Sequence, residues 1–262
     1  MIKLVVTDVD GTLLDDKSEL SELNRQALLD CRKNGIGVIL ATGKSIKSIK
    51  FIIDILELKL PQITLNGTVV IDDRQDVIYS LLIGQSLYYE LLKTIKEMGY
   101  KPLAALTDGN IYYDSYDKNY AVYEKVNEPI YKTDMLEKDE FAKNCVSIGL
   151  ALKETDPLDD FLRRKYSKIL HIVRSGEYFF DMINPKASKG NALHYIIRNT
   201  RIKRADIAVF GDSPNDMSMF EYAGLRIAVK NSFPEILAKA DYITDENYNS
   251  GLGKAIYRHI LK

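Results

Sequence analysis

Aspartates stand in two short segments that lie far apart in the 262-residue chain. Asp8 and Asp10 belong to the first segment, and Asp212 belongs to the second. If the fold brings these three carboxylates together, their mutual repulsion requires a cation. Because no His or Cys stands nearby, the ligands are oxygens, which favour Mg²⁺ over zinc. The sequence therefore predicts a magnesium site of the kind that also binds a phosphate oxygen.

Further residues have the chemistry to hold and attack a phosphate ester. Thr42 and the backbone N–H of Gly43 can donate hydrogen bonds to phosphate oxygens. Lys189 stands at the start of a predicted helix, where its charge and the helix N-terminus both favour an anion. A carboxylate such as Asp8 can act as a nucleophile through an aspartyl-phosphate intermediate. Phosphoryl transfer depends mainly on positioning and charge neutralisation, and these residues supply both.

Predicted buried strands position these residues. Short apolar runs at 2–7, 38–41, 62–65 and 207–210 alternate with helical patterns, which predicts right-handed crossovers and a parallel sheet. Open parallel sheets bind ligands beyond the carboxyl ends of their strands. The residues that follow the four runs are, in order, Asp8 and Asp10, Thr42-Gly43, Asn66-Gly67, and Asp212 with Asn215 and Asp216. We therefore expect these side chains to lie along one edge of the sheet.

The segment 82–184 has a different pattern. Alternating runs at 103–113 and 169–183 predict two hairpins, and 158–166 predicts a helix, so this segment is expected to form an α+β module with an antiparallel sheet. The sequence thus predicts an α/β fold. Residues 1–81 and 185–262 would form a Rossmann-like core with a parallel sheet, and 82–184 an inserted cap domain.

Four segments resemble the motifs of the haloacid dehalogenase (HAD) superfamily. Asp8-Val9-Asp10-Gly11-Thr12 resembles the first motif, Thr42-Gly43-Lys44 the second, Lys189-Gly190 the third, and Gly211-Asp212-Ser213-Pro214-Asn215-Asp216 the fourth. Their order and spacing fit across almost the whole chain. The insertion between the second and third motifs is similar to the type IIB cap of the Cof-like hydrolases.

The resemblance implies catalytic and metal-binding roles. Asp8 would attack phosphorus, and Asp10 would protonate the leaving oxygen and then activate water. Asp8 and Asp212 would bind Mg²⁺ through their side chains, and Asp10 through its backbone carbonyl.

The resemblance also implies which residues hold the phosphoryl group. They are Thr42, Gly43, Lys189, Asn215 and the backbone N–H of Val9. Asp216 would orient Lys189 or a metal-bound water, and Thr12 would support the loop. The family usually has Arg where this chain has Lys44, which cannot make the bidentate contact of an Arg. We therefore expect Lys44 to be a solvated lysine at a helix start.

The cap is expected to select the substrate. The segment 82–184 contains 11 of the 17 tyrosines, whose flat faces and hydroxyls suit sugars. Tyr112, Tyr113 and Tyr116 are the first candidates, although tyrosines also fill hairpin faces and the interface between cap and core. Asn66 and Gly67 are further candidates for specificity. Sugar phosphates are the favoured class, and pyridoxal phosphate, flavin mononucleotide and other small phosphomonoesters remain open.

Other functions share parts of this pattern. Gly43-Lys44-Ser45 suggests a phosphate-binding loop, but the first Gly of that motif would fall on Val38. The aspartates also suit a receiver domain, which is far shorter than this chain. A phosphomutase would use the same aspartates but pass the phosphoryl group to a second sugar hydroxyl. A non-catalytic protein that binds a phosphorylated ligand is the remaining alternative.

Composition limits the partners and the compartment. The net charge of −1 gives no field that would attract nucleic acid or an anionic membrane. Cys31 and Cys145 are too few for a disulfide framework or a zinc site, and both are expected to be buried. We expect neither a signal peptide nor a membrane helix, and so a cytoplasmic protein that is a monomer or a weak homodimer. Its partner would be a small phosphorylated metabolite.

Overall fold

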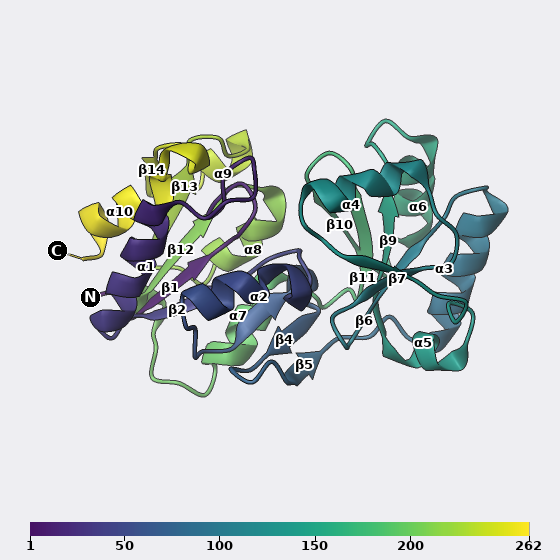
Figure 1. Ribbon diagram of the computed structural model, residues 1–262, viewed down its shortest axis with the longest axis horizontal. Helices are drawn as coiled ribbons and strands as arrows, with labels where there is room; N and C mark the ends of the chain where they lie inside the picture. Colours follow the sequence, from purple (N-terminus) through teal and green to yellow (C-terminus); the bar gives the residue numbers. More distant parts are fainter. Residues whose placement is uncertain (262) are drawn as a thin grey trace.

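The computed structural model describes residues 1–261, which form a core and a cap side by side (Figure 1). A five-stranded parallel sheet, in the order β14-β13-β12-β1-β2, lies at the centre of the core. Its strands are β1 (Leu4–Thr7), β2 (Gly37–Leu40), β12 (Ile207–Gly211), β13 (Leu225–Val229) and β14 (Tyr242–Thr244).

Helices cover both faces of this sheet because side chains alternate along each strand. On β1, Val5 packs into an apolar cluster with α1 and α10, whereas Leu4 and Val6 pack with α7 and α8 on the opposite face. The core helices are α1 (Glu22–Lys33), α2 (Ile46–Ile55), α7 (Lys189–Ile197), α8 (Met217–Phe220), α9 (Pro234–Leu237) and α10 (Gly251–His259). Short 3₁₀ helices lie at Leu65–Gly67, Arg204–Asp206, Pro214–Asp216 and Asn247–Asn249.

The third predicted strand does not continue the parallel sheet in regular register. It forms as β3 (Gln62–Thr64) but pairs antiparallel with β4 (Val69–Ile71), which in turn pairs with β5 (Val77–Ser80). Only an isolated parallel bridge between Ala41 and Ile63 joins it to the extension of β2. The chain reverses at Asn66 and Gly67, which have φ angles of 56° and 84°. A tight turn therefore replaces the expected crossover.

The cap contains a six-stranded sheet in the order β10-β11-β9-β6-β7-β8. Its strands are β6 (Leu103–Leu106), β7 (Ile111–Tyr113), β8 (Ile130–Lys132), β9 (Cys145–Ala151), β10 (His171–Ser175) and β11 (Phe179–Ile183). Its helices are α3 (Gln85–Glu97), α4 (Ala121–Lys125), α5 (Asp139–Asn144) and α6 (Pro157–Tyr166), with a 3₁₀ helix at Lys118–Tyr120. All its pairings are antiparallel except that of β7 with β8. Both predicted hairpins are present.

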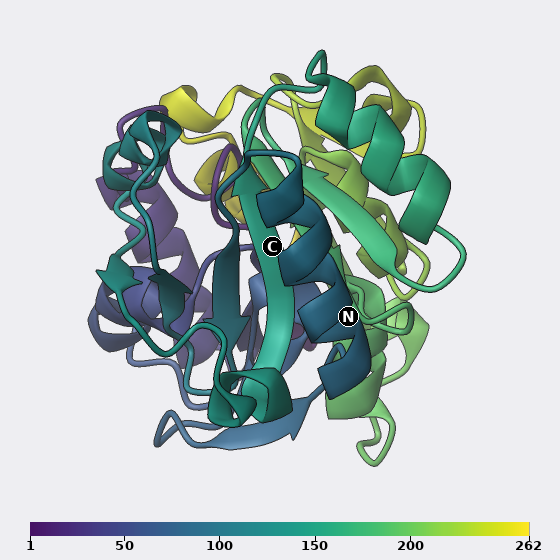
Figure 2. The ribbon, with the colours of Figure 1, turned by 90° about the vertical axis from the view of Figure 1, so that its right-hand side faces the viewer.

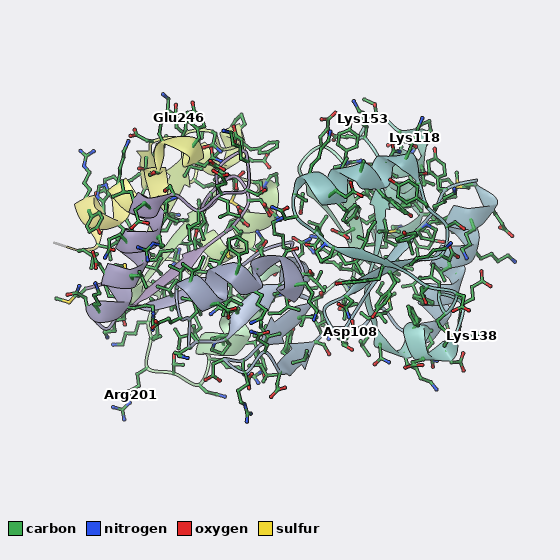
Figure 3. The ribbon with its side chains drawn as sticks, in the orientation of Figure 1. Asp108, Lys118, Lys138, Lys153, Arg201 and Glu246 are labelled. Atoms are coloured by element: carbon green, nitrogen blue, oxygen red, sulfur yellow. The ribbon has the colours of Figure 1, made fainter. Side chains whose placement is uncertain are left out.

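One face of the cap sheet is covered by helices, and the other faces the core. Figure 2 shows α3 in front of the sheet, and α3, α5 and α6 pack there against the side chains of Ile148 and Phe180. On the opposite face, Leu103 and Ile111 share an apolar cluster with Ile46 and Leu65 of the core. Side chains of both domains fill the gap between the ribbons (Figure 3).

These observations confirm the predicted fold class of a parallel α/β core with an inserted α+β cap. The buried face of α1 includes a polar residue. Leu23 is 38% exposed, whereas Asn24 is buried. The Asn24 side chain donates to the Leu13 carbonyl and accepts from the Gly253 N–H, so its polar atoms are satisfied. Within residues 1–261, no helix is long and apolar enough to cross a membrane.

Candidate active site

The first and fourth motifs meet at the carboxyl ends of neighbouring strands. Asp8 follows β1 and Asp212 follows β12, and these strands pair directly in parallel. Thr42 lies beyond the end of β2, which pairs with the other side of β1. Parallel pairing thus places three segments from distant parts of the sequence at one edge of the sheet, as the strand pattern predicted.

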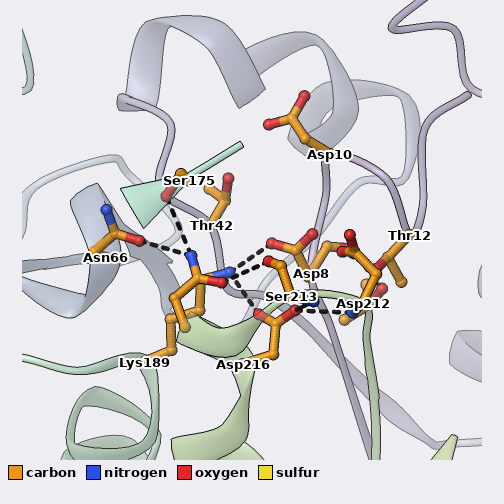
Figure 4. Close-up of polar contacts among 12 residues, drawn as sticks. Asp8, Asp10, Thr12, Thr42, Asn66, Ser175, Lys189, Asp212, Ser213 and Asp216 are labelled. Atoms are coloured by element: carbon orange, nitrogen blue, oxygen red, sulfur yellow. Dashed lines mark hydrogen bonds and ion pairs between the residues drawn. The ribbon is translucent and has the colours of Figure 1, made fainter. Parts of the chain in front are cut away.

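Lys189 lies between two buried carboxylates. Its Nζ donates to Asp8 Oδ1 and to Asp216 Oδ1, each at 2.6 Å (Figure 4). Burial lowers the pKa of Lys189, but the two carboxylates outweigh burial and hold this pKa above its ordinary value. Lys189 begins α7, whose N-cap Ser188 accepts from the Asn191 N–H. The lysine is therefore a fixed cation at the base of the site.

Asp8, Asp212 and Asp216 form a group that suits a metal ion. One oxygen from each lies within 4.8 Å of the others. Burial raises the pKa of Asp8, and the charges of Asp216 and Asp212 raise it further against the effect of Lys189. Burial and the Asp216 charge also raise the pKa of Asp212 to about 7. Mutual repulsion between oxygen ligands is the condition that a bound divalent cation relieves.

The three carboxylates of this group have different partners. Asp212 accepts from the Thr12 hydroxyl at 2.8 Å. Asp216 bonds Lys189 through one oxygen, and its other oxygen accepts from the backbone N–H groups of Asp212 and Ser213. Because protein donors already hold both oxygens of Asp216, Asp8 and Asp212 are the better fit to a metal.

Asp10 lies apart from this group (Figure 4). Its side chain is 45% exposed and lines a cavity between core and cap. Withdrawal from bulk water raises the pKa of Asp10, and the nearby Lys44 opposes this shift. A carboxylic acid with a raised pKa at the edge of a cavity suits a general acid.

The expectation that Lys44 is solvated is wrong. The Lys44 side chain is only 6% exposed, and its Nζ lies 3.3 Å from Asp10 Oδ1. The same nitrogen donates to the Val126 carbonyl of the cap. The loop around Val126 covers Lys44, so the lysine links the cap to Asp10.

The residues expected to hold phosphate lie around Asp8. Thr42, Gly43 and Asn215 line the cavity. The side-chain amide of Asn215 donates to Asn66 Oδ1 at 3.0 Å and lies 3.3 Å from the Ser175 hydroxyl of the cap (Figure 4). Val9 is buried next to Asp8, and its carbonyl accepts from the N–H groups of Leu13 and Leu14.

Asn66 and Gly67 occupy different environments. Asn66 lies between Asn215 and the cap residue Asp181, whose Oδ2 is 3.4 Å from the Asn66 amide nitrogen. Gly67 packs against the segment before α7, where a Cβ atom would lie 2.2 Å from the Ser188 carbonyl oxygen. Gly67 therefore permits the close approach that positions Lys189. Neither Asn66 nor Gly67 is among the residues that line the cavity, although both were expected to contribute to specificity.

The cavity has a volume of about 320 Å³ and is shared by core and cap. None of the three predicted tyrosines lines it. Tyr112 donates to Asp108, and Tyr113 and Tyr116 pack edge-to-face with each other. The tyrosine that does line the cavity is Tyr123, and the other cap residues that line it include Leu103, Glu128, Ser147, Ser175, Phe179 and Asp181. Of these residues, Ser175 ends β10, next to the turn of the hairpin predicted at 169–183.

Comparison with known proteins agrees with this arrangement. The family model of haloacid dehalogenase-like hydrolases matches residues 5–256. YxeH of Bacillus subtilis, which carries the name of a phosphatase, is 31% identical over 278 residues, covering 100% of this chain and 99% of that protein.

Solved structures share the fold. A haloacid dehalogenase-like hydrolase from Bacteroides thetaiotaomicron is similar with a TM-score of 0.88 and 24% identity, covering 98% of this chain and 99% of that one. A sugar phosphatase of HAD subclass IIB has a TM-score of 0.85 and 22% identity, covering 98% of each chain. The cap expected from the resemblance is therefore present as a fold. The chain belongs to the haloacid dehalogenase-like hydrolase family and is a phosphatase of that family.

Proposed function

We propose that this phosphatase is a Mg²⁺-dependent phosphomonoester hydrolase that acts through an aspartyl-phosphate on Asp8. The observation that carries the proposal is the position of Asp8 beside two further carboxylates and Lys189, at one end of a cavity that Asp10 also lines. The substrate would be a small phosphorylated metabolite, with sugar phosphates as the favoured class.

In this mechanism Asp8 is the nucleophile and Asp10 is the general acid and base. Asp8 attacks phosphorus as a carboxylate, and its burial beside the charges of Asp216 and Asp212, which raises its pKa despite Lys189, supports a role for a divalent cation there. Asp10 gives its proton to the leaving oxygen and then takes a proton from the water that hydrolyses the intermediate. Lys44, 3.3 Å away, steadies the ionised form of Asp10 in the second step.

Asp8 and Asp212, with the backbone carbonyl of Asp10, would hold Mg²⁺, which would neutralise charge on the phosphoryl oxygens. Lys189 supports the ionised form of Asp8, and Asp216 holds Lys189 in place through their 2.6 Å contact. Thr42, Gly43 and Asn215 line the cavity around Asp8 and would donate to the phosphoryl oxygens, together with the Val9 N–H. Thr12 orients Asp212 through its hydroxyl.

A phosphate-release assay tests the proposal. Purified protein would be given a panel of sugar phosphates and other small phosphomonoesters, with Mg²⁺ or with a chelator. We expect release that requires Mg²⁺ and that falls by about a thousandfold or more in Asp8→Asn, because the nucleophile is lost. Asp73→Asn, which changes an exposed aspartate, is the control.

The alternatives give other results. Formation of a phosphate isomer without net release would indicate a phosphomutase. Binding of phosphate esters without any turnover would indicate a non-catalytic protein. Asp8→Asn with the rate of the unmodified protein would exclude the covalent mechanism.

A further inference from the structure

A partly buried carboxylate of the cap, that of Asp181, faces the cavity from the side opposite to Asp8. Side chains alternate along β11, and Phe180 and Met182 pack beneath the cap helices. Phe179 and Asp181 therefore face the core, and both line the cavity. Opposite Asp181 on β9 stands Gly149, where a Cβ atom would lie 3.2 Å from Asp181 Oδ1. The glycine leaves room for the carboxylate and for a ligand atom beside it.

Protein donors occupy only some of the hydrogen-bond acceptor positions of the Asp181 carboxylate. Its Oδ1 accepts from the Ser147 hydroxyl at 3.0 Å, and its Oδ2 has a long contact of 3.4 Å with the Asn66 amide. An ionised carboxylate has about four acceptor positions, so some of them stay open toward the cavity. Burial raises the pKa of Asp181 to about 6, and the carboxyl therefore remains mainly ionised at neutral pH.

No cation compensates this charge among residues 1–261. Neither a lysine, an arginine nor a histidine forms an ion pair with Asp181 there, and the charged group that acts on it is the like charge of Glu128. By contrast, the buried aspartate of the cap, Asp159, is held by both Arg163 and Arg174. A charge without a counterion is costly even where it is only partly withdrawn from water, and the place of Asp181 on the wall of a cavity points to a partner that comes from outside the chain.

The other polar groups around Asp181 add to the excess of negative charge on the cap wall of the cavity. The cap side of the cavity also presents the hydroxyls of Tyr123 and Ser147 and the carboxylate of Glu128, whose two oxygens accept from Ser45. Within the described residues, Lys44 is the cation that lines the cavity. Lys44 is already engaged by Asp10 and the Val126 carbonyl. This wall thus presents acceptors and negative charge, which attract hydrogen-bond donors and repel anions.

We propose that Asp181 is a specificity-determining residue that binds an ammonium or hydroxyl group on the organic part of the phosphate ester. An ammonium is preferred over a hydroxyl because it also neutralises the carboxylate. Esters with a second anionic group, such as a carboxylate, are disfavoured. The apolar side chains of Leu103 and Phe179 on the same wall cover the carbon skeleton of the substrate. This inference rests on the proposed phosphatase function and adds the chemistry of the group that the cap admits.

Three matched esters test the inference. The 1-phosphates of 6-amino-6-deoxyglucose, glucose and glucuronate share the same ring and phosphate position and differ only at C6, which carries an amine, a hydroxyl or a carboxylate. We expect kcat/KM of the unmodified protein to fall in that order. In Asp181→Asn, the preference for amine over carboxylate should shrink roughly ten- to hundredfold, mainly through KM, because a hydrogen bond to a charged group is lost. Asp134→Asn, an exposed aspartate of the cap, should keep the original order.

A binding measurement separates this inference from the catalytic proposal. Calorimetry with the Asp8→Asn variant measures affinity for the same three esters without turnover, and the order of affinities should be the same. Equal affinity ratios in Asp181→Asn and the unmodified protein, or a preference for glucuronate 1-phosphate, would overturn the role of Asp181. If p-nitrophenyl phosphate and every other ester resisted the unmodified protein, the proposed function would fail instead.

Discussion

At the core end of the cavity, Lys189 lies between the carboxylates of Asp8 and Asp216, whereas at the cap end Asp181 has hydrogen bonds but no cation among the described residues. Both ends hold negative charge away from bulk water, which costs free energy. The core end offsets much of this cost with its own lysine, and the cap end leaves it for a ligand to offset. The comparison suggests that the core end is built to act on any phosphate group, and the cap end to select what the phosphate is attached to.

Removal of the core cation should have the largest effect. Lys189→Met keeps a side chain of similar length but leaves Asp8 and Asp216 without their shared partner. We expect the free energy of unfolding to fall by about 3–5 kcal/mol, because breaking a buried ion pair leaves uncompensated charge. Denaturant unfolding in the presence of a chelator measures this loss.

The loss of stability in Lys189→Met should become larger as the pH increases. Lys189 opposes the rise in the pKa of Asp8, so without the lysine the folded-state pKa of Asp8 is higher still, the folded protein binds more protons than the unfolded one, and its stability falls further as the pH increases. Lys186→Met, which changes an exposed lysine just before the same helix, serves as the control. A deficit below about 1 kcal/mol at every pH would show that Lys189 does not stabilise the core end.

Removal of the charge of Asp181 at the cap end should stabilise the protein, whereas removal of Lys189 destabilises it. The folded-state pKa of Asp181 is about 6 against an ordinary value of 3.8. Its charge therefore costs nothing well below pH 4, where the carboxyl is protonated in both states, and costs most above about pH 6. We expect Asp181→Asn to stabilise the protein at pH 8 by as much as about 3 kcal/mol, and much less at pH 4.

Thermal unfolding at the two pH values measures this effect. Asp134→Asn should change stability little at either pH, because that residue is exposed. If Asp181→Asn destabilised the protein at pH 8, Asp181 would be a structural residue of the cap, and the contrast between the two ends would be lost.

The core end could be predicted from the sequence because its residues occupy positions that local pattern reveals. Asp8, Thr42 and Asp212 each come soon after a short buried strand, and parallel pairing of β12, β1 and β2 then brings them to one edge. The resemblance to a family added roles to these positions. Neither source could show that Lys44 is buried, since the loop at Val126 that covers it is 82 residues away.

The cap end could not be predicted in this way because its contacts depend on strand register and on how the cap lies on the core. Asp181 stands in an alternating strand, and the sequence does not say which face of that strand meets the cavity. The number of tyrosines was misleading for the same reason. Tyr113, Tyr116 and Tyr120 pack against one another, and Tyr123 lines the cavity.

The smallest effect is expected where the two ends meet, at Glu128. This cap carboxylate accepts from the backbone N–H and the hydroxyl of Ser45, which is the N-cap residue of α2 in the core. The helix N-terminus favours the negative charge of Glu128, and Glu128→Gln removes that charge while keeping the shape. This contact forms only when the cap lies against the core. Its loss should therefore destabilise the closed position of the cap by about 1 kcal/mol relative to an open one.

We therefore expect Glu128→Gln to lower kcat/KM roughly fivefold, with little change in melting temperature. Glu124→Gln alters an exposed glutamate of the neighbouring α4 and should leave kcat/KM unchanged. Steady-state kinetics and thermal unfolding of the two variants measure both quantities. A fall of several degrees in melting temperature at constant kcat/KM would mean that Glu128 stabilises the fold and does not couple the cap end to the core end.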